Sequence, residues 1–229
     1  MAQDTLVSMW SAQTPPLPHS WIPEQLLRDH DEGVEFTIDL LRAGFEEDWR
    51  DEFEEIARLQ LESFLEQEPN EDLTRFIVFP LKRPFAAEAS IAIGQPVTDE
   101  EVAGSTMVDV VRSRSLGVGI VTTQTQADAE SGIVSATRSV LFTDDRRSVL
   151  FRLGPAPVPV IAAASIGLAA LVQGTVVKDE SDDSQFVGEH TYGYLENAEE
   201  PLDALTSSFD FGNLPVRGTD MEWFEQAQQ

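Results

Sequence analysis

The runs "GIVSATRSVLFT" (residues 132–143) and "RSVLFRLG" (147–154) flank the short polar turn "TDDRR" (143–147). Both runs are rich in β-branched and aromatic residues, which favour strands, and a turn of this length joins antiparallel neighbours. A third run of the same kind, "VVRSRSLGVGIVTTQTQA" (110–127), precedes them across the polar segment "DAES" (128–131). The three runs therefore predict an antiparallel meander over residues 110–154.

The longest uncharged stretch of the chain, residues 153–177, follows this meander and contains "VPVIAAASIGLAALVQGTVV" (158–177). Its length would suffice to span a bilayer. Three prolines at its start and many alanines make it less apolar than segments that insert into membranes. We therefore expect no membrane span. The stretch predicts an Ala-rich helix over 159–172 packed on the meander, followed by a short apolar strand in "GTVV" (174–177).

The residues before the meander carry four more periodic patterns. "VEFTIDLL" (34–41) alternates apolar and polar residues, which predicts a strand with one wet face. Residues 45–65 repeat apolar side chains at spacings of three and four between many acids, which predicts an amphipathic helix. "RFIVFPL" (75–81) and "AEASIAIGQPV" (87–97) predict two further strands.

These patterns indicate an α+β fold, in which an antiparallel sheet with a β-meander packs against the amphipathic helix and the Ala-rich helix. We expect three parts in the chain: a flexible leader (1–16), a single α+β domain (17–177) and a partly disordered acidic tail (178–229). The tail boundary rests on charge, because residues 179–229 hold 13 acids against one base, Arg217. Such a segment is too poor in apolar residues to fold by itself.

The charge balance excludes several classes of function. Against 41 Asp and Glu stand 15 Lys and Arg, so the formal net charge is −26. A field of this sign repels phosphate backbones and anionic lipids, so we expect no binding to nucleic acid. The chain has no cysteine, which rules out disulfides and thiolate metal sites. Its start lacks the pattern of a secretory signal, and we therefore expect a cytoplasmic location.

Motifs for catalysis are absent from the sequence. The three histidines, His19, His30 and His190, stand in different contexts without metal-ligand spacing. There is no phosphate-binding loop, dinucleotide fingerprint or nucleophile elbow. We accordingly predict no catalytic residue, no metal ligand and no cofactor.

The function expected from these observations is that of a non-catalytic accessory or adaptor, chaperone- or immunity-like, whose acidic surface binds a basic protein partner. The candidate partner-binding residues are aromatic side chains of the acidic tail, namely Tyr192, Tyr194, Phe209, Phe211, Trp223 and Phe224. Two alternatives stay open: a structural component of a virion or other assembly, and an enzyme or small-ligand binder with a pocket between the sheet and helix 45–65. The oligomeric state is not determined by the sequence.

The order of elements resembles the PsbP-like α/β/α fold, which includes actinobacterial LpqN-type proteins and the Eag-type chaperones of type VI secretion. "LPHSWIP" (17–23) is similar to the "LP-x-x-W" opening common in that fold, and "RRSVLFRLGPAPVPVIAAASIGLAAL" (146–171) resembles its last strand and closing helix. The signal and lipidation cysteine of the LpqN type are missing here, and the acidic tail is foreign to the fold. The resemblance implies a binder or adaptor and assigns no functional residue.

Overall fold

The computed structural model describes residues 10–16, 20–29, 32–70, 72–97, 108–127, 132–180, 183–188 and 198–206. In chain order the elements are β1 (Trp10–Gln13), β2 (Trp21–Pro23), α1 (Glu24–Asp29), α2 (Gly33–Phe45), the 3-10 helix η1 (Glu46–Asp48), α3 (Asp51–Glu66), β3 (Leu73–Val78), β4 (Ala87–Gly94), β5 (Val108–Ser113), β6 (Gly117–Ala127), β7 (Val134–Thr143), β8 (Ser148–Pro157), α5 (Val158–Gly174), β9 (Val176–Asp179) and α6 (Pro201–Thr206).

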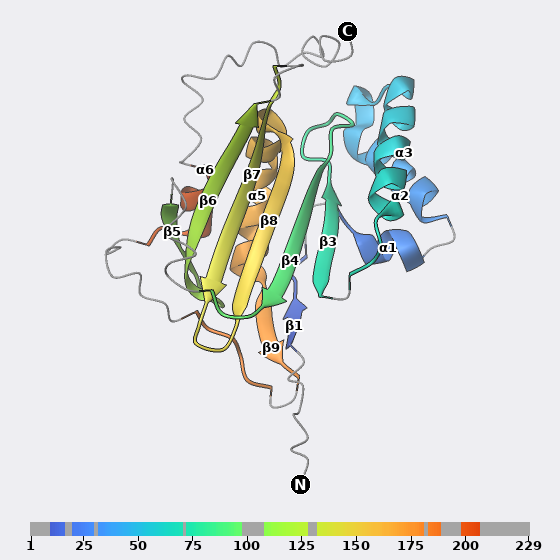
Figure 1. The fold of residues 1–229 in the computed structure, drawn as a ribbon. Coiled ribbons are helices and arrows are strands. Elements are labelled where there is room, and N and C mark those ends of the chain that lie inside the picture. The colour runs from blue at the N-terminus through green and yellow to red at the C-terminus, as the bar shows by residue number, and fades with distance from the viewer. Residues whose placement is uncertain are drawn as a thin grey trace.

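Seven strands form one antiparallel sheet in the order β2-β3-β4-β8-β7-β6-β5 (Figure 1). The predicted meander forms its larger part, and the two strands predicted at 75–81 and 87–97 are confirmed as β3 and β4. Helices pack on both faces, so the predicted α+β class is confirmed. A second, two-stranded sheet pairs β1 with β9.

Helix α5 covers the middle of one face, behind β7 and β8 in Figure 1. Ten of its residues are buried in the main core, because alanines and a glycine let its backbone approach the sheet closely. At Gly167 an added Cβ would lie 2.3 Å from Nε1 of Trp21, so only glycine fits there. The predicted closing helix is thus confirmed. Among the described residues, no helix is both long and apolar enough to cross a membrane.

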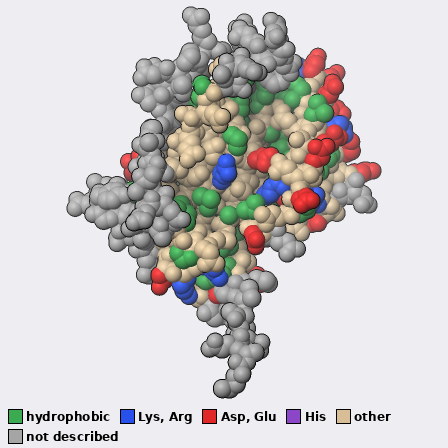
Figure 2. Space-filling view, viewed as in Figure 1, with side chains coloured by type: hydrophobic (Ala, Val, Ile, Leu, Met, Phe, Trp, Pro, Cys, Tyr) green, Lys and Arg blue, Asp and Glu red, His purple; other side chains and the backbone are tan. Residues whose placement is uncertain are grey.

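Helices α1, α2 and α3 stand on the opposite face, at the end of the sheet formed by β2 and β3 (Figure 1). Phe53, Leu61 and Phe64 of α3 pack there with Ile22 and Ile77 of the sheet. These three helices do not reach across the whole sheet. We call the remaining part of this face, formed by β4, β8, β7 and β6, the open face (Figure 2).

The strand predicted at 34–41 is wrong, because these residues belong to α2. Val34, Ile38, Leu41 and Phe45 recur at helical spacing, and this stripe packs against α3, while Phe36 is 47 % exposed. Apolar residues at every second position of an eight-residue segment are compatible with both the alternation of a strand and the spacing of a helix. Leu41, which breaks the alternation, and Phe45, which lies beyond the segment, continue the helical stripe and favour the helix.

Two other boundaries differ from the prediction. The helix predicted at 45–65 begins at Asp51, because η1 and the extended backbone at Trp49 separate it from α2. The run 110–127 forms two strands, β5 and β6, instead of one. The chain turns between them at residues 114–116, and Gly117 follows with a φ of +80°, a conformation that glycine adopts without strain.

Segments assigned to the leader and the tail pack on the domain. In the leader, Trp10 to Gln13 pair with β9. In the tail, the Phe186 side chain is fully buried in the main core, and α6 lies against α5 with Ala204 and Leu205 buried. Backbone hydrogen bonds also join Gly188 and Glu199 to the β5–β6 hairpin. The division at residues 16 and 177 stays a prediction.

Candidate functional site

The residues predicted to bind a partner, Tyr192, Tyr194, Phe209, Phe211, Trp223 and Phe224, lie outside the described residues. The same is true of His19, His30 and His190. Among the residues that the structure describes, no group of three or more His, Cys, Asp or Glu side chains is placed to hold a metal ion. The candidate surfaces are therefore formed by other residues.

The first candidate surface is the acidic hairpin, which we define as residues 32–66 (α2, η1 and α3). It contains 12 acidic and three basic residues, for a net charge of −9. Figure 2 shows these acids gathered along one side of the molecule. By contrast, residues 73–180 contain 11 acids and ten bases. Of these two segments, the hairpin is strongly acidic and residues 73–180 are nearly neutral.

Arginines pair with some of these acids across the two helices. Arg58 of α3 forms ion pairs with Glu35 of α2 and with Glu54. Arg42 pairs with both Asp39 and Glu54 at 2.7 Å. The hydrogen bond from Arg58 lowers the pKa of the exposed Glu35 carboxyl group. Exposed ion pairs of this kind contribute little to stability, so these contacts chiefly set how α2 lies beside α3.

Other acids of the hairpin are exposed and surround an apolar side chain. Leu59 is 60 % exposed, and Glu55 and Glu62 stand one helical turn before and after it. Within the described part of the chain, neither glutamate makes an ion pair. An exposed leucine between free carboxylates suits contact with a surface that is both apolar and basic.

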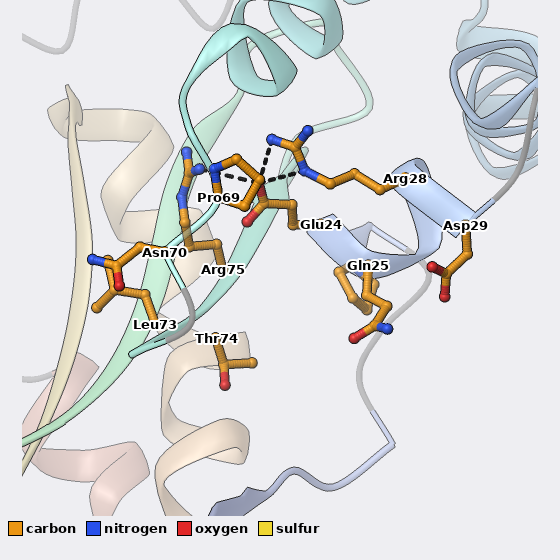
Figure 3. Close-up of a pocket in the computed structure, with 10 residues that line it drawn as sticks. Glu24, Gln25, Arg28, Asp29, Pro69, Asn70, Leu73, Thr74 and Arg75 are labelled. Carbon is orange, nitrogen blue, oxygen red and sulfur yellow. Dashed lines mark hydrogen bonds and ion pairs between the residues drawn. The ribbon is translucent and has the colours of Figure 1, made fainter.

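The second candidate site is a buried charge network beside the hairpin, shown in Figure 3. Glu24 of α1 is only 8 % exposed, and its Oε1 accepts hydrogen bonds from Nε and Nη2 of Arg28 at 2.9 and 2.7 Å. Arg75 of β3 donates to the same oxygen at 3.2 Å. One carboxylate thus holds two guanidinium groups, which fixes α1 onto β3.

Three further side chains surround Arg75. Its Nη2 donates to Oε1 of Gln67 at 2.6 Å and to Oε2 of Glu88 at 3.4 Å. Its guanidinium carbon lies 4.4 Å from the centroid of the Phe64 ring. Arg75 therefore joins α1, the end of α3 and the edge of the open face.

Arg75 separates two surface cavities. One, of about 450 Å³, lies beside α1 and is lined by Glu24, Arg28 and Arg75 among others (Figure 3). The other, of about 250 Å³, lies on the open face and is lined by Arg75, Glu88 and Arg152 among others. Apolar side chains of α3 and the sheet pack against one another beside these cavities. The pocket expected between the sheet and helix 45–65 stays a prediction.

The network gives a prediction about stability. Replacing Glu24 by Gln should lower the free energy of unfolding by about 2–4 kcal/mol, because Arg28 and the buried Arg75 lose the carboxylate that both of them contact. Glu88 also contacts Arg75, but its side chain is 47 % exposed. Replacing it by Gln should therefore lower the free energy of unfolding by less than about 1 kcal/mol. Urea unfolding of the two variants measures both values. If both variants lost the same free energy of unfolding, the burial of Glu24 would not determine how much the network stabilises the protein.

A second buried arginine lies on the other face of the sheet. Arg138 of β7 is fully buried, and its guanidinium donates to Oγ1 of Thr123, to Oγ of Ser165 and to the carbonyl oxygen of Leu205 in α6. Burial lowers the pKa of Arg138 to about 10, and the charge of Asp109 opposes this shift. The residue is therefore still protonated at neutral pH, and it links the sheet, α5 and α6.

Sequence reasoning missed three arginines of the sheet, although the sequence does mark them. Arg75, Arg138 and Arg152 are each a basic residue within or at the start of a β-rich run, in "RFIVFP", "SATRSV" and "LFRLG". A charge inside a strand pattern either faces solvent or requires a buried partner.

Comparison with models of known protein families, with curated proteins and with solved structures gave no match for this chain.

Proposed function

We propose that this protein is a non-catalytic adaptor that binds a basic protein partner through the acidic hairpin. The observation that carries the proposal is the segregation of charge, with a net charge of −9 over residues 32–66 and −1 over residues 73–180. Complementary charge steers association and selects partners, and apolar contact at the centre of the surface supplies affinity. Leu59, exposed between Glu55 and Glu62, provides that apolar contact.

The test uses the full-length protein as bait in an extract of its source cells, followed by binding measurements with the purified partner. The variant Glu55→Lys/Glu62→Lys reverses the charge on both sides of Leu59. Its matched control, Asp145→Lys/Glu180→Lys, makes the same change in net charge at exposed positions outside the hairpin. We expect the hairpin variant to weaken binding at least tenfold, and the control to weaken it less than threefold.

Salt supplies an independent readout of the same interaction. Raising the ionic strength should weaken binding of the wild-type protein, because exposed charges are screened over distances of about 10 Å at 0.1 M salt. The proposal is contradicted if no basic protein is enriched, if the purified partner binds the hairpin variant as tightly as the wild type, or if its affinity is insensitive to salt.

A further inference from the structure

The open face carries a row of polar side chains that the strand register places side by side. In sheet order the row consists of Arg75, Ser90, Arg152, Ser139 and Thr122, and each residue pairs with the next on the neighbouring strand. The residues that alternate with them along the strands lie in the core beneath α5, so the row points away from that helix. Figure 2 shows a basic side chain standing in the middle of this face.

An apolar row runs parallel to the polar one. It lies two residues away on every strand, toward the same end of the sheet. It consists of Leu73, Ala92, Leu150, Leu141 and Ile120, again paired in register. Ile120 is 3 % exposed, whereas the other four are half-buried and so retain accessible apolar surface. The open face therefore presents an apolar strip next to a charged group.

Arg152 is the group of the polar row that can accept a new partner. Its side chain is exposed, and within the described part of the chain it makes no ion pair or hydrogen bond. Arg75 is different, because it is buried and already bonded to Glu24, Gln67 and Glu88. Both arginines line the cavity of about 250 Å³, in which Glu88 is the acidic residue and is already engaged by Arg75.

The charge of the whole molecule restricts what such a site can bind. A net charge of −26 repels anions at a distance, so a small inorganic anion would gain too little from one exposed arginine. A ligand that adds apolar contact to the charge contact would overcome this repulsion. The ligand must therefore combine one anionic group with an apolar body.

We propose that the open face binds an amphiphilic carboxylate, with its headgroup at Arg152 and its apolar chain over Leu150 and Leu141. The hydroxyl groups of Ser90 and Ser139, which flank Arg152 on the neighbouring strands, donate to the carboxylate oxygens. The site lies on a different surface from the acidic hairpin and does not depend on the partner proposed above.

Decanoate, below its micellar concentration, is the probe for this site, and calorimetric titration of the full-length protein measures its binding. We expect one saturable site per chain. Arg152→Gln should weaken binding at least tenfold, because it removes a charge-assisted contact. The matched control Arg114→Gln removes an exposed arginine from the turn between β5 and β6 and should leave the affinity unchanged. Leu150→Ser should also weaken binding, because it interrupts the apolar strip.

A comparison probe separates the charge contact from the apolar contact. Decanol carries the same chain without an anion and should bind at least tenfold more weakly than decanoate. The proposal is wrong if decanoate shows no saturable binding, if Arg152→Gln binds it as tightly as the wild type, or if decanol binds equally well. The variant Glu55→Lys/Glu62→Lys should bind decanoate normally, so failure here is distinguishable from failure of the hairpin proposal. Thermal unfolding of each variant confirms that it is folded.

Discussion

Truncation of the chain after Val177 is expected to lower the free energy of unfolding by about 3–6 kcal/mol or more. The truncated chain loses Phe186 and Leu205, both fully buried, whose burial contributes together about 3–6 kcal/mol. It also loses the backbone hydrogen bonds that Gly188 and Glu199 make to the β5–β6 hairpin. A domain of this size is stable by about 5–15 kcal/mol in total, so a loss of this size is large.

Charge alone leads to the opposite expectation, because an acidic tail that stays outside the core could be removed without consequence. Urea unfolding of chains that end at residues 177 and 206, compared with the full-length protein, shows whether the tail contributes to the core or lies outside it. We expect the chain that ends at Thr206, which retains α6, to unfold at a midpoint near that of the full-length protein. An unchanged midpoint for the chain that ends at Val177 would show that the tail lies outside the cooperative unit.

Replacement of Arg138 by Ala is the second change with a large expected effect, about 3–5 kcal/mol. It removes a fully buried side chain and leaves a cavity, and it deprives the Leu205 carbonyl oxygen of its donor at the end of α6. Arg152→Ala is the matched control, because Arg152 is an exposed arginine on the neighbouring strand β8 and faces the other way. Its expected cost is about 0.5 kcal/mol or less.

Amide exchange tests whether the Arg138 effect is located at α6. We expect Arg138→Ala to accelerate exchange in residues 201–206 more than in the strands of the meander. Equal unfolding free energies for the Ala variants of Arg138 and Arg152 would contradict the assigned role. Because the lowered pKa of Arg138 is still about 10, its protonation does not change near neutrality. Folding releases this proton only above about pH 10, so stability from this group rises with pH there and is constant around pH 7.

The sequence predicted the central architecture because the period of its apolar residues is unambiguous there. In the meander, β-branched runs separated by short polar turns allow only antiparallel strands, and the following Ala-rich segment is long enough to cover them. Residues 34–41 failed because an eight-residue window fits a strand and a helix equally well, and Phe36 faces outward in the structure.

The surfaces were harder to predict than the elements. The acidic character of residues 45–65 was visible in the composition, so the sequence already contained most of the acidic hairpin. The network of Glu24 and Arg75 joins residues 51 positions apart, and nothing in either segment indicates the other. The open face depends on the order of the strands, since β4 lies beside β8, and on the position of α1–α3 at one end of the sheet. Neither can be derived from local periodicity.

The central claim, that the acidic hairpin is the partner-binding surface, is tested most directly by amide hydrogen exchange of the full-length protein with and without its purified basic partner. The account predicts slower exchange in residues 33–66 on binding, with the meander strands unchanged, and no such protection in Glu55→Lys/Glu62→Lys at the same partner concentration. Protection confined to strands of the sheet, with α2 and α3 exchanging as in the free protein, would contradict it.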